Sequence, residues 1–197
     1  MSKHLWLYEG LTEYAAHHMQ LQGGLITLTE FLNRMTEKYR ASNFSFDNSI
    51  PFTKLSKGVL NKYKEEYGNV YQKGALIGLC LDLYLRSETN GMYGTQQLIR
   101  DLSARFGPEI SFKDEELFKI IAETTKMKGI DRFFANYVSG NKELPLAQLL
   151  EKICCELRST DEKKDKVRIL NDLKQELKEI KNPSPSQLKL RQAWIVN

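Results

Sequence analysis

The feature that most constrains this fold is a nearly unbroken apolar run at its centre, residues 71–86 (YQKGALIGLCLDLYLR). A surface helix carries one apolar stripe, whereas this run is apolar on almost every side and therefore predicts a buried central helix. Elsewhere apolar residues recur at three- and four-residue steps, the period of amphipathic helices. No segment shows the alternation of a strand over several residues. We therefore expect an all-α fold, built as a compact multi-helix domain.

The segments around this run predict further helices. The first is expected over residues 4–22, ended by Gly23-Gly24, and its predicted apolar face comprises Leu5, Tyr8, Leu11, Ala15 and Met19. Further helices are expected at residues 94–106, 111–124, 130–138 and 144–157. In the second of these, Ser111 and Asp114 have the spacing of an N-terminal capping box. Residues 42–56 predict a polar and aromatic loop, which either lines a cleft or packs onto the helices.

The composition changes after Leu157. Charged residues dominate residues 156–181, and the apolar ones form a narrow stripe: Val167, Leu170, Leu173, Leu177 and Ile180. This pattern predicts a charged surface helix that docks along one seam. Pro183 and Pro185 are expected to end it, leaving a short tail. We therefore divide the chain into a helical domain, residues 1–157, and a charged helix with a proline-terminated tail, residues 158–197.

Charge and hydropathy exclude two classes of partner. The formal net charge is +4, from 29 basic and 25 acidic residues mixed along the chain. Nucleic-acid binding needs a clustered basic face, so we expect no nucleic-acid partner. No stretch approaches the roughly 18 to 20 apolar residues of a membrane span. The compartment is left undetermined.

Two short motifs carry chemical information. Trp6, Glu9, Gly10, Thr12 and Tyr14 form the pattern W-x-x-E-G-x-T-x-Y, which resembles a segment of the gluzincin zinc metallopeptidases. About sixty residues later, Val70–Leu76 (VYQKGAL) resembles the Y-x-K-G-A-L segment of the same enzymes. Either motif alone is a weak signal. Together they are much stronger, because their order, separation and helical setting agree.

The wider likeness runs from about Leu5 to about Leu150 and is closest to the glycyl-aminopeptidase family, whose members usually carry a PDZ domain. Residues 136–140 (NYVSG) and 143–145 (ELP) are similar to the stretch that closes the family's helical domain. The resemblance implies hydrolysis of peptide substrates with Zn²⁺ as cofactor, of aminopeptidase type. A hard carboxylate suits a catalytic zinc site, which takes three protein ligands and a water.

The same resemblance assigns roles to three residues. Glu9 is expected to be the third zinc ligand, and the hydroxyl of Tyr71 to stabilise the oxyanion of the transition state. Glu13 is either a carboxylate that orients a ligand histidine or a solvated helix charge. The competing interpretations are an ordinary helix glutamate for Glu9 and a core tyrosine for Tyr71. Lys73 is expected to be a structural charge.

The sequence departs from the family pattern in two ways. It contains no HExxH motif, since its histidines are His4, His17 and His18, and we interpret the last two as surface residues. Two zinc ligands and the general base are therefore expected in a missing N-terminal half of a parent enzyme, and this chain alone should be inactive. The glycine-rich PDZ sequence is also not visible. The alternative is a non-catalytic helical binding or scaffold module derived from such a peptidase.

Overall fold

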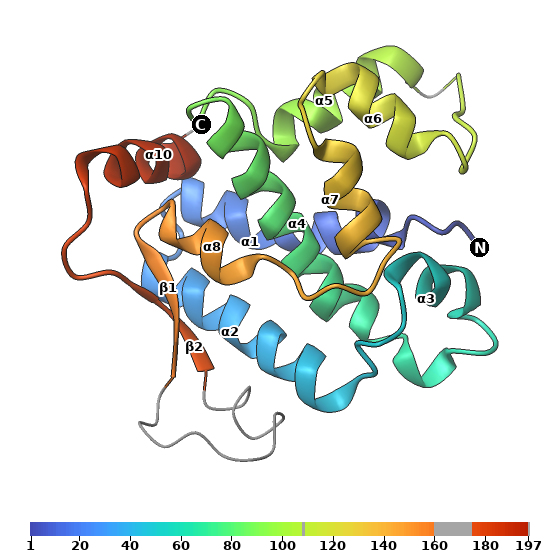
Figure 1. The fold of residues 1–197 in the computed structure, drawn as a ribbon, viewed down its shortest axis with the longest axis horizontal. Coiled ribbons are helices and arrows are strands. Elements are labelled where there is room, and N and C mark those ends of the chain that lie inside the picture. Colours follow the sequence, from blue (N-terminus) through green and yellow to red (C-terminus); the bar gives the residue numbers. More distant parts are fainter. Residues whose placement is uncertain (108, 160–174, 197) are drawn as a thin grey trace.

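A computed structural model describes residues 1–107, 109–159 and 175–196 (Figure 1). The fold is mostly helical, as predicted. Its helical elements are η1 (Trp6–Gly10), α1 (Leu11–Gln22), α2 (Leu28–Ser45), α3 (Phe52–Gly58), η2 (Lys64–Glu66), α4 (Asn69–Glu88), α5 (Thr95–Phe106), α6 (Leu117–Thr125), α7 (Ile130–Tyr137), α8 (Leu146–Glu151) and α10 (Pro185–Val196). Two strands, β1 (Cys155–Ser159) and β2 (Gln175–Glu179), form a small antiparallel sheet. None of the helices in the described part of the chain combines the length and the hydropathy of a membrane-spanning segment.

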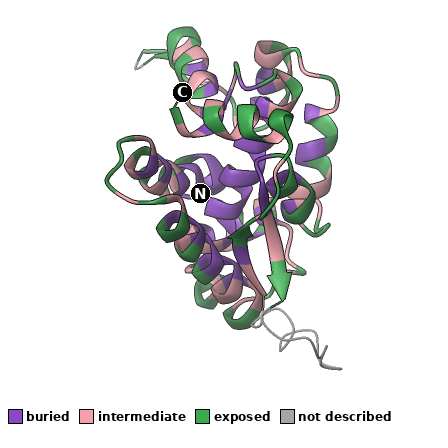
Figure 2. Ribbon diagram, turned by 90° about the vertical axis from the view of Figure 1, so that its left-hand side faces the viewer, coloured by how far each residue is buried: buried purple, intermediate pink, exposed green. Residues whose placement is uncertain are grey.

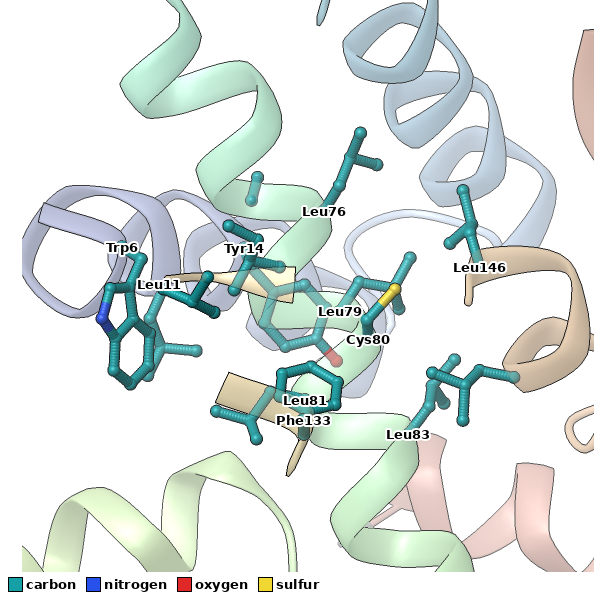
Figure 3. Close-up of a cluster of buried hydrophobic side chains, with 14 of the residues drawn as sticks. Trp6, Leu11, Tyr14, Leu76, Leu79, Cys80, Leu81, Leu83, Phe133 and Leu146 are labelled. Atoms are coloured by element: carbon teal, nitrogen blue, oxygen red, sulfur yellow. The ribbon is translucent and has the colours of Figure 1, made fainter. Parts of the chain in front are cut away.

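Helix α4 is the central element, which confirms the expectation from its apolar run. It passes through the middle of the molecule and contacts α1, α2, α5, α8 and α10 (Figure 1). Figure 2 shows that burial is concentrated in this interior. Side chains from several elements meet there, including Leu79 and Leu83 of α4, Trp6 of η1 and Phe133 of α7 (Figure 3). Burial of this apolar surface is the main favourable contribution to folding.

The first predicted helix is present, and its predicted apolar face is correct for Leu5 and Leu11 and wrong for Tyr8 and Met19. Tyr8 and Met19 are exposed. The buried face also includes positions outside the predicted set, namely Leu7, Tyr14, His18 and Leu21. The chain begins as a π-helix, η1, before it continues as α1. The buried face is decided by the contact of these elements with α4 and, around His18, by the rings of Phe31 on α2 and Trp194 near the C-terminus.

Two boundaries in the middle of the chain also differ from expectation. Helix α2 continues to Ser45 and α3 begins at Phe52, so the loop predicted over residues 42–56 is much shorter. Helix α6 begins at Leu117 and not at residue 111. The carboxylate of Asp114 accepts hydrogen bonds from the hydroxyl of Ser2 and the backbone N–H of Lys3. It therefore holds the N-terminal segment instead of capping the first turn of a helix.

The charged helix predicted after Leu157 is wrong where the structure describes this region. Residues 155–159 and 175–179 are paired strands, with Leu157 opposite Leu177. Leu177 is buried, and its backbone N–H donates to the hydroxyl of Thr36 on α2 at 2.9 Å. Packing of β2 onto α2 therefore outweighs the helical spacing of the leucines. The middle of the predicted stripe, Val167 to Leu173, lies outside the described residues.

The predicted tail after Pro183 is also wrong, because Pro185–Val196 form helix α10. Its Trp194 is fully buried. The ring of Trp194 stacks on the imidazole of His18, with ring centroids 5.1 Å apart. The guanidinium of Arg86 donates to the carbonyl of Ala193 at 2.9 Å. Helix α10 is thus joined to α1 and α4 by both apolar and polar contacts.

Candidate functional site

The two sequence motifs meet where η1 crosses α4 in direct backbone contact. A Cβ atom on Gly10 would lie 2.6 Å from the Cα of Gly74, and one on Gly74 would lie 2.7 Å from the Cα of Gly10. One turn further, a Cβ on Gly78 would lie 2.9 Å from the Cβ of Tyr14. Real Cβ contacts are not this short, so only glycine permits this crossing. It places the segments that carry Glu9 and Tyr71 against each other.

Glu9 and Tyr71 are neighbours in the folded chain, and both are half-buried. The hydroxyl of Tyr67 lies 3.3 Å from that of Tyr71, and the two rings meet edge to face at an angle of 65°. The contact with Tyr67, burial and the charge of Glu9 together raise the pKa of Tyr71 to about 12. Tyr71 is therefore a protonated hydrogen-bond donor at neutral pH. Glu9 itself lies in the π-helical turn, a backbone irregularity frequent at functional sites.

Tyr14, the last residue of the first motif, anchors α1 to α4. Its hydroxyl donates to the carboxylate of Asp82 at 2.8 Å and accepts from the indole N–H of Trp194 at 2.9 Å. Asp82 also accepts from the guanidinium of Arg86 at 3.1 Å and from the backbone N–H of Thr95 at 2.6 Å. Although burial acts to raise the pKa of Asp82, Arg86 and these hydrogen bonds hold it below its usual range.

This buried network was not predicted from the sequence. A signal for it existed, because an aspartate inside an apolar run, followed by arginine four residues later, indicates a buried i,i+4 ion pair. The side chains of Asp82 and Arg86 are almost completely buried. Buried carboxylates need partners, and here each partner comes from a different part of the fold. The network therefore fixes the helices that carry the Glu9 and Tyr71 pair.

Glu13 forms its own contacts on α1. Its carboxylate lies 2.6 Å from the ammonium of Lys38 and 3.3 Å from the Nε2 atom of His17. The hydrogen bond from Lys38 is the main cause that lowers the pKa of Glu13. The Nδ1 atom of His17 lies 3.1 Å from the guanidinium of Arg34, which can only donate. His17 is therefore neutral with its proton on Nε2, and the role of Glu13 toward a ligand histidine stays a prediction.

The other two histidines are structural, and the prediction of a surface position for His18 is wrong. His18 is buried between the rings of Tyr14 and Trp194. The Nε2 atom of His4 contacts the carbonyl of Asp114, and its Nδ1 atom accepts from the indole of Trp6. Within the described part of the chain, no three His, Cys, Asp or Glu residues cluster as a metal site would need. The described residues therefore supply no complete set of metal ligands, and the role of Glu9 as one ligand stays a prediction.

Comparison with known proteins tests the resemblance directly. Residues 1–77 match the family model described as M61 glycyl aminopeptidase. This match contains both motifs and ends three residues after Gly74. The resemblance to the glycyl-aminopeptidase family is confirmed for this segment. No curated protein matches the sequence.

A solved structure extends the likeness at the level of the fold. The chain is similar to a crystal structure of an aminopeptidase N family protein from Idiomarina loihiensis, with a TM-score of 0.66 and 23% sequence identity. The match covers 81% of this chain and 28% of that protein's chain. At this identity it shows a shared fold. The described chain thus corresponds to less than a third of that protein's length.

Lys73, within the M61-like segment, borders a cavity of about 600 Å³. This cavity lies between α2, α4 and the segment that leads into α8, and neither Glu9 nor Tyr71 lines it. Asn48 and Ser49, from the loop predicted either to line a cleft or to pack, are among its lining residues. Phe52 of the same predicted loop is in the core. Residues of that predicted loop therefore divide between the wall of a cavity and the core.

The charge of Lys73 gives a testable dependence of stability on pH. Burial lowers the pKa of Lys73 from 10.5 to about 8. Between these values the unfolded chain holds a proton that the folded chain has lost, so the free energy of unfolding rises with pH across this window. Below about pH 8 the folded chain bears the cost of the buried charge, about 3 kcal/mol from the size of the pKa change.

Replacing Lys73 with methionine is therefore expected to raise the free energy of unfolding most at pH 7, with the gain shrinking by up to about 3 kcal/mol toward pH 10. Urea unfolding of both proteins at several pH values measures this difference. Lys142→Met, at an exposed position on the same cavity, is the matched control and should differ from wild type by a constant amount. A constant difference for Lys73→Met as well would show that its ammonium is not desolvated.

Proposed function

We propose that this chain is the helical half of a zinc-dependent peptidase of aminopeptidase type, whose intact parent hydrolyses peptide bonds. In this proposal Glu9 is one of three zinc ligands and Tyr71 is the donor to the oxyanion. The observation that carries the proposal is the Gly10 and Gly74 crossing, which brings the Glu9 carboxylate beside a phenol that stays protonated. The match of residues 1–77 to the glycyl-aminopeptidase family supports it.

The two side chains suit these tasks chemically. A bound Zn²⁺ supplies Lewis-acid polarisation and an activated water. The carboxylate of Glu9 is a hard oxygen ligand held by a rigid helix contact. The hydroxyl of Tyr71 can donate to negative charge that develops on the carbonyl oxygen of a scissile bond. The remaining ligands and the general base belong, in this proposal, to an HExxH helix in the missing half of the parent.

A second candidate function follows from one observation, the lack of any HExxH motif in these 197 residues. A helical binding or scaffold module derived from a peptidase would keep the fold without its catalytic half. The parent gene separates the two proposals, because an HExxH motif encoded shortly before Met1 supports the enzyme. A parent gene without that motif supports the scaffold.

The enzyme proposal is tested by zinc content. We expect the 197-residue chain alone to retain no zinc after dialysis and to cleave no peptide, because one carboxylate does not hold the ion tightly. The intact parent should retain about one zinc per chain and release the first residue of a peptide substrate. Elemental analysis and a peptide cleavage assay measure both. One zinc per isolated chain, lost in Glu9→Ala but kept when His17 and His18 are both replaced, would contradict the proposed division of ligands.

A further inference from the structure

Outside the Glu9 and Tyr71 pair, the strongest unexplained feature is the ammonium of Lys73 in its cavity. Lys73 is only 7% exposed. Its Nζ atom donates to the carbonyl of Asn48 at 3.2 Å, and no other hydrogen bond or ion pair of this group occurs among residues 1–107, 109–159 and 175–196. An ammonium has three donors, so two lack a protein partner there.

The neighbouring acid does not neutralise this charge. Asp47 is the acid whose charge acts on Lys73, but it forms no ion pair with it in the described structure. Its carboxylate accepts from the backbone N–H of Ser49 at 2.9 Å, and its side chain is exposed. Removing a charge from water without a close partner is costly. A ligand that brings an anion to the Nζ atom of Lys73 would recover part of this cost.

The apolar part of the lining indicates the body of such a ligand. Three leucines form this part of the wall: Leu76, Leu144 and Leu146. The side chain of Asn48 already forms hydrogen bonds to α2. A volume of about 600 Å³ is in the range of small-molecule sites. Polar side chains, including those of Asp47 and Glu143, also line this cavity, so only part of its wall is apolar. We propose that this cavity binds a small carboxylate with an apolar body, its anionic end on Lys73 and its body against these leucines.

The proposal is independent of peptide hydrolysis, and its test uses binding alone. The probe is 3-phenylpropanoate, titrated into the ¹⁵N-labelled 197-residue chain and followed by amide shifts in two-dimensional NMR. We expect saturable shifts confined to residues that line the cavity. The uncharged isostere 3-phenylpropanamide should bind about ten- to a hundredfold more weakly, because it cannot pair with the ammonium. This comparison uses the wild-type chain and needs no variant to fold.

Two variants then test whether the positive charge of Lys73 binds the carboxylate of the probe. Lys73→Met should weaken binding of 3-phenylpropanoate by about ten- to a hundredfold. Lys54→Met, at an exposed position of α3 outside the cavity lining, should leave it unchanged. Acetylglycylphenylalanine carries the same phenyl and carboxylate groups at the C-terminus of a peptide, so it distinguishes peptide ligands from free carboxylic acids. Tighter binding than that of 3-phenylpropanoate assigns the site to peptide C-termini, and weaker binding assigns it to free acids. Equal binding of acid and amide, shifts away from the cavity, or no saturable binding would each overturn the proposal.

Discussion

Replacing Tyr71 with phenylalanine in the intact parent is expected to lower turnover by roughly 100- to 1,000-fold, about 3 to 4 kcal/mol. The substitution deletes one hydroxyl and leaves every proposed metal ligand in place. The charge that this hydroxyl meets develops only in the transition state, so the Michaelis constant should change little. Steady-state kinetics, zinc analysis and thermal unfolding together measure the effect. Zinc content and stability should stay near wild type.

Glu9→Ala provides the contrast to Tyr71→Phe, because removing a ligand should lower zinc content and activity together. Tyr67→Phe is the matched control for the loss of a phenol hydroxyl at the same place. Tyr67 is 40% exposed and contacts Tyr71, but it carries no proposed role in catalysis. Full turnover in Tyr71→Phe would show that Tyr71 is a packing residue and that the role implied by the family does not hold here.

Trp194→Ala is expected to lower the free energy of unfolding by about 3 to 5 kcal/mol, the usual cost of truncating a buried tryptophan. Trp194 is fully buried, stacks on His18 and donates to the hydroxyl of Tyr14. Its removal leaves a cavity and takes one hydrogen bond from the Asp82 network. A loss of this size is a large fraction of the stability of a domain. Urea unfolding followed by circular dichroism measures it.

Leu188→Ala is the control on the same helix. Leu188 is 41% exposed, so its truncation should change the free energy of unfolding by no more than about 0.5 kcal/mol. If Trp194→Ala cost as little as Leu188→Ala, helix α10 would not be part of the core in solution. The tail predicted from Pro183 and Pro185 would then describe the protein better than the helix does.

Much of the helical framework could be predicted from the sequence, because its signals are local. The apolar run of residues 71–86 identified α4 as the central helix, because a helix that is apolar on nearly every side is buried by other elements. The two motifs indicated Glu9 and Tyr71 as candidate site residues. Their spacing could not show that Gly10 and Gly74 touch, because a contact between elements sixty residues apart depends on how the helices cross.

The helical class, the central helix and the family resemblance of the Glu9 and Tyr71 segments are therefore properties that local sequence patterns predict. The conformation of the C-terminal part depends instead on contacts with distant elements. Leu177 fits a helical stripe and a strand equally well, and packing on α2 selects the strand. Two prolines before Trp194 suggest a tail. The stacking of Trp194 on His18 and its hydrogen bond to Tyr14 stabilise a helix there instead. In both cases burial against a distant element outweighs the weaker local preference of the chain.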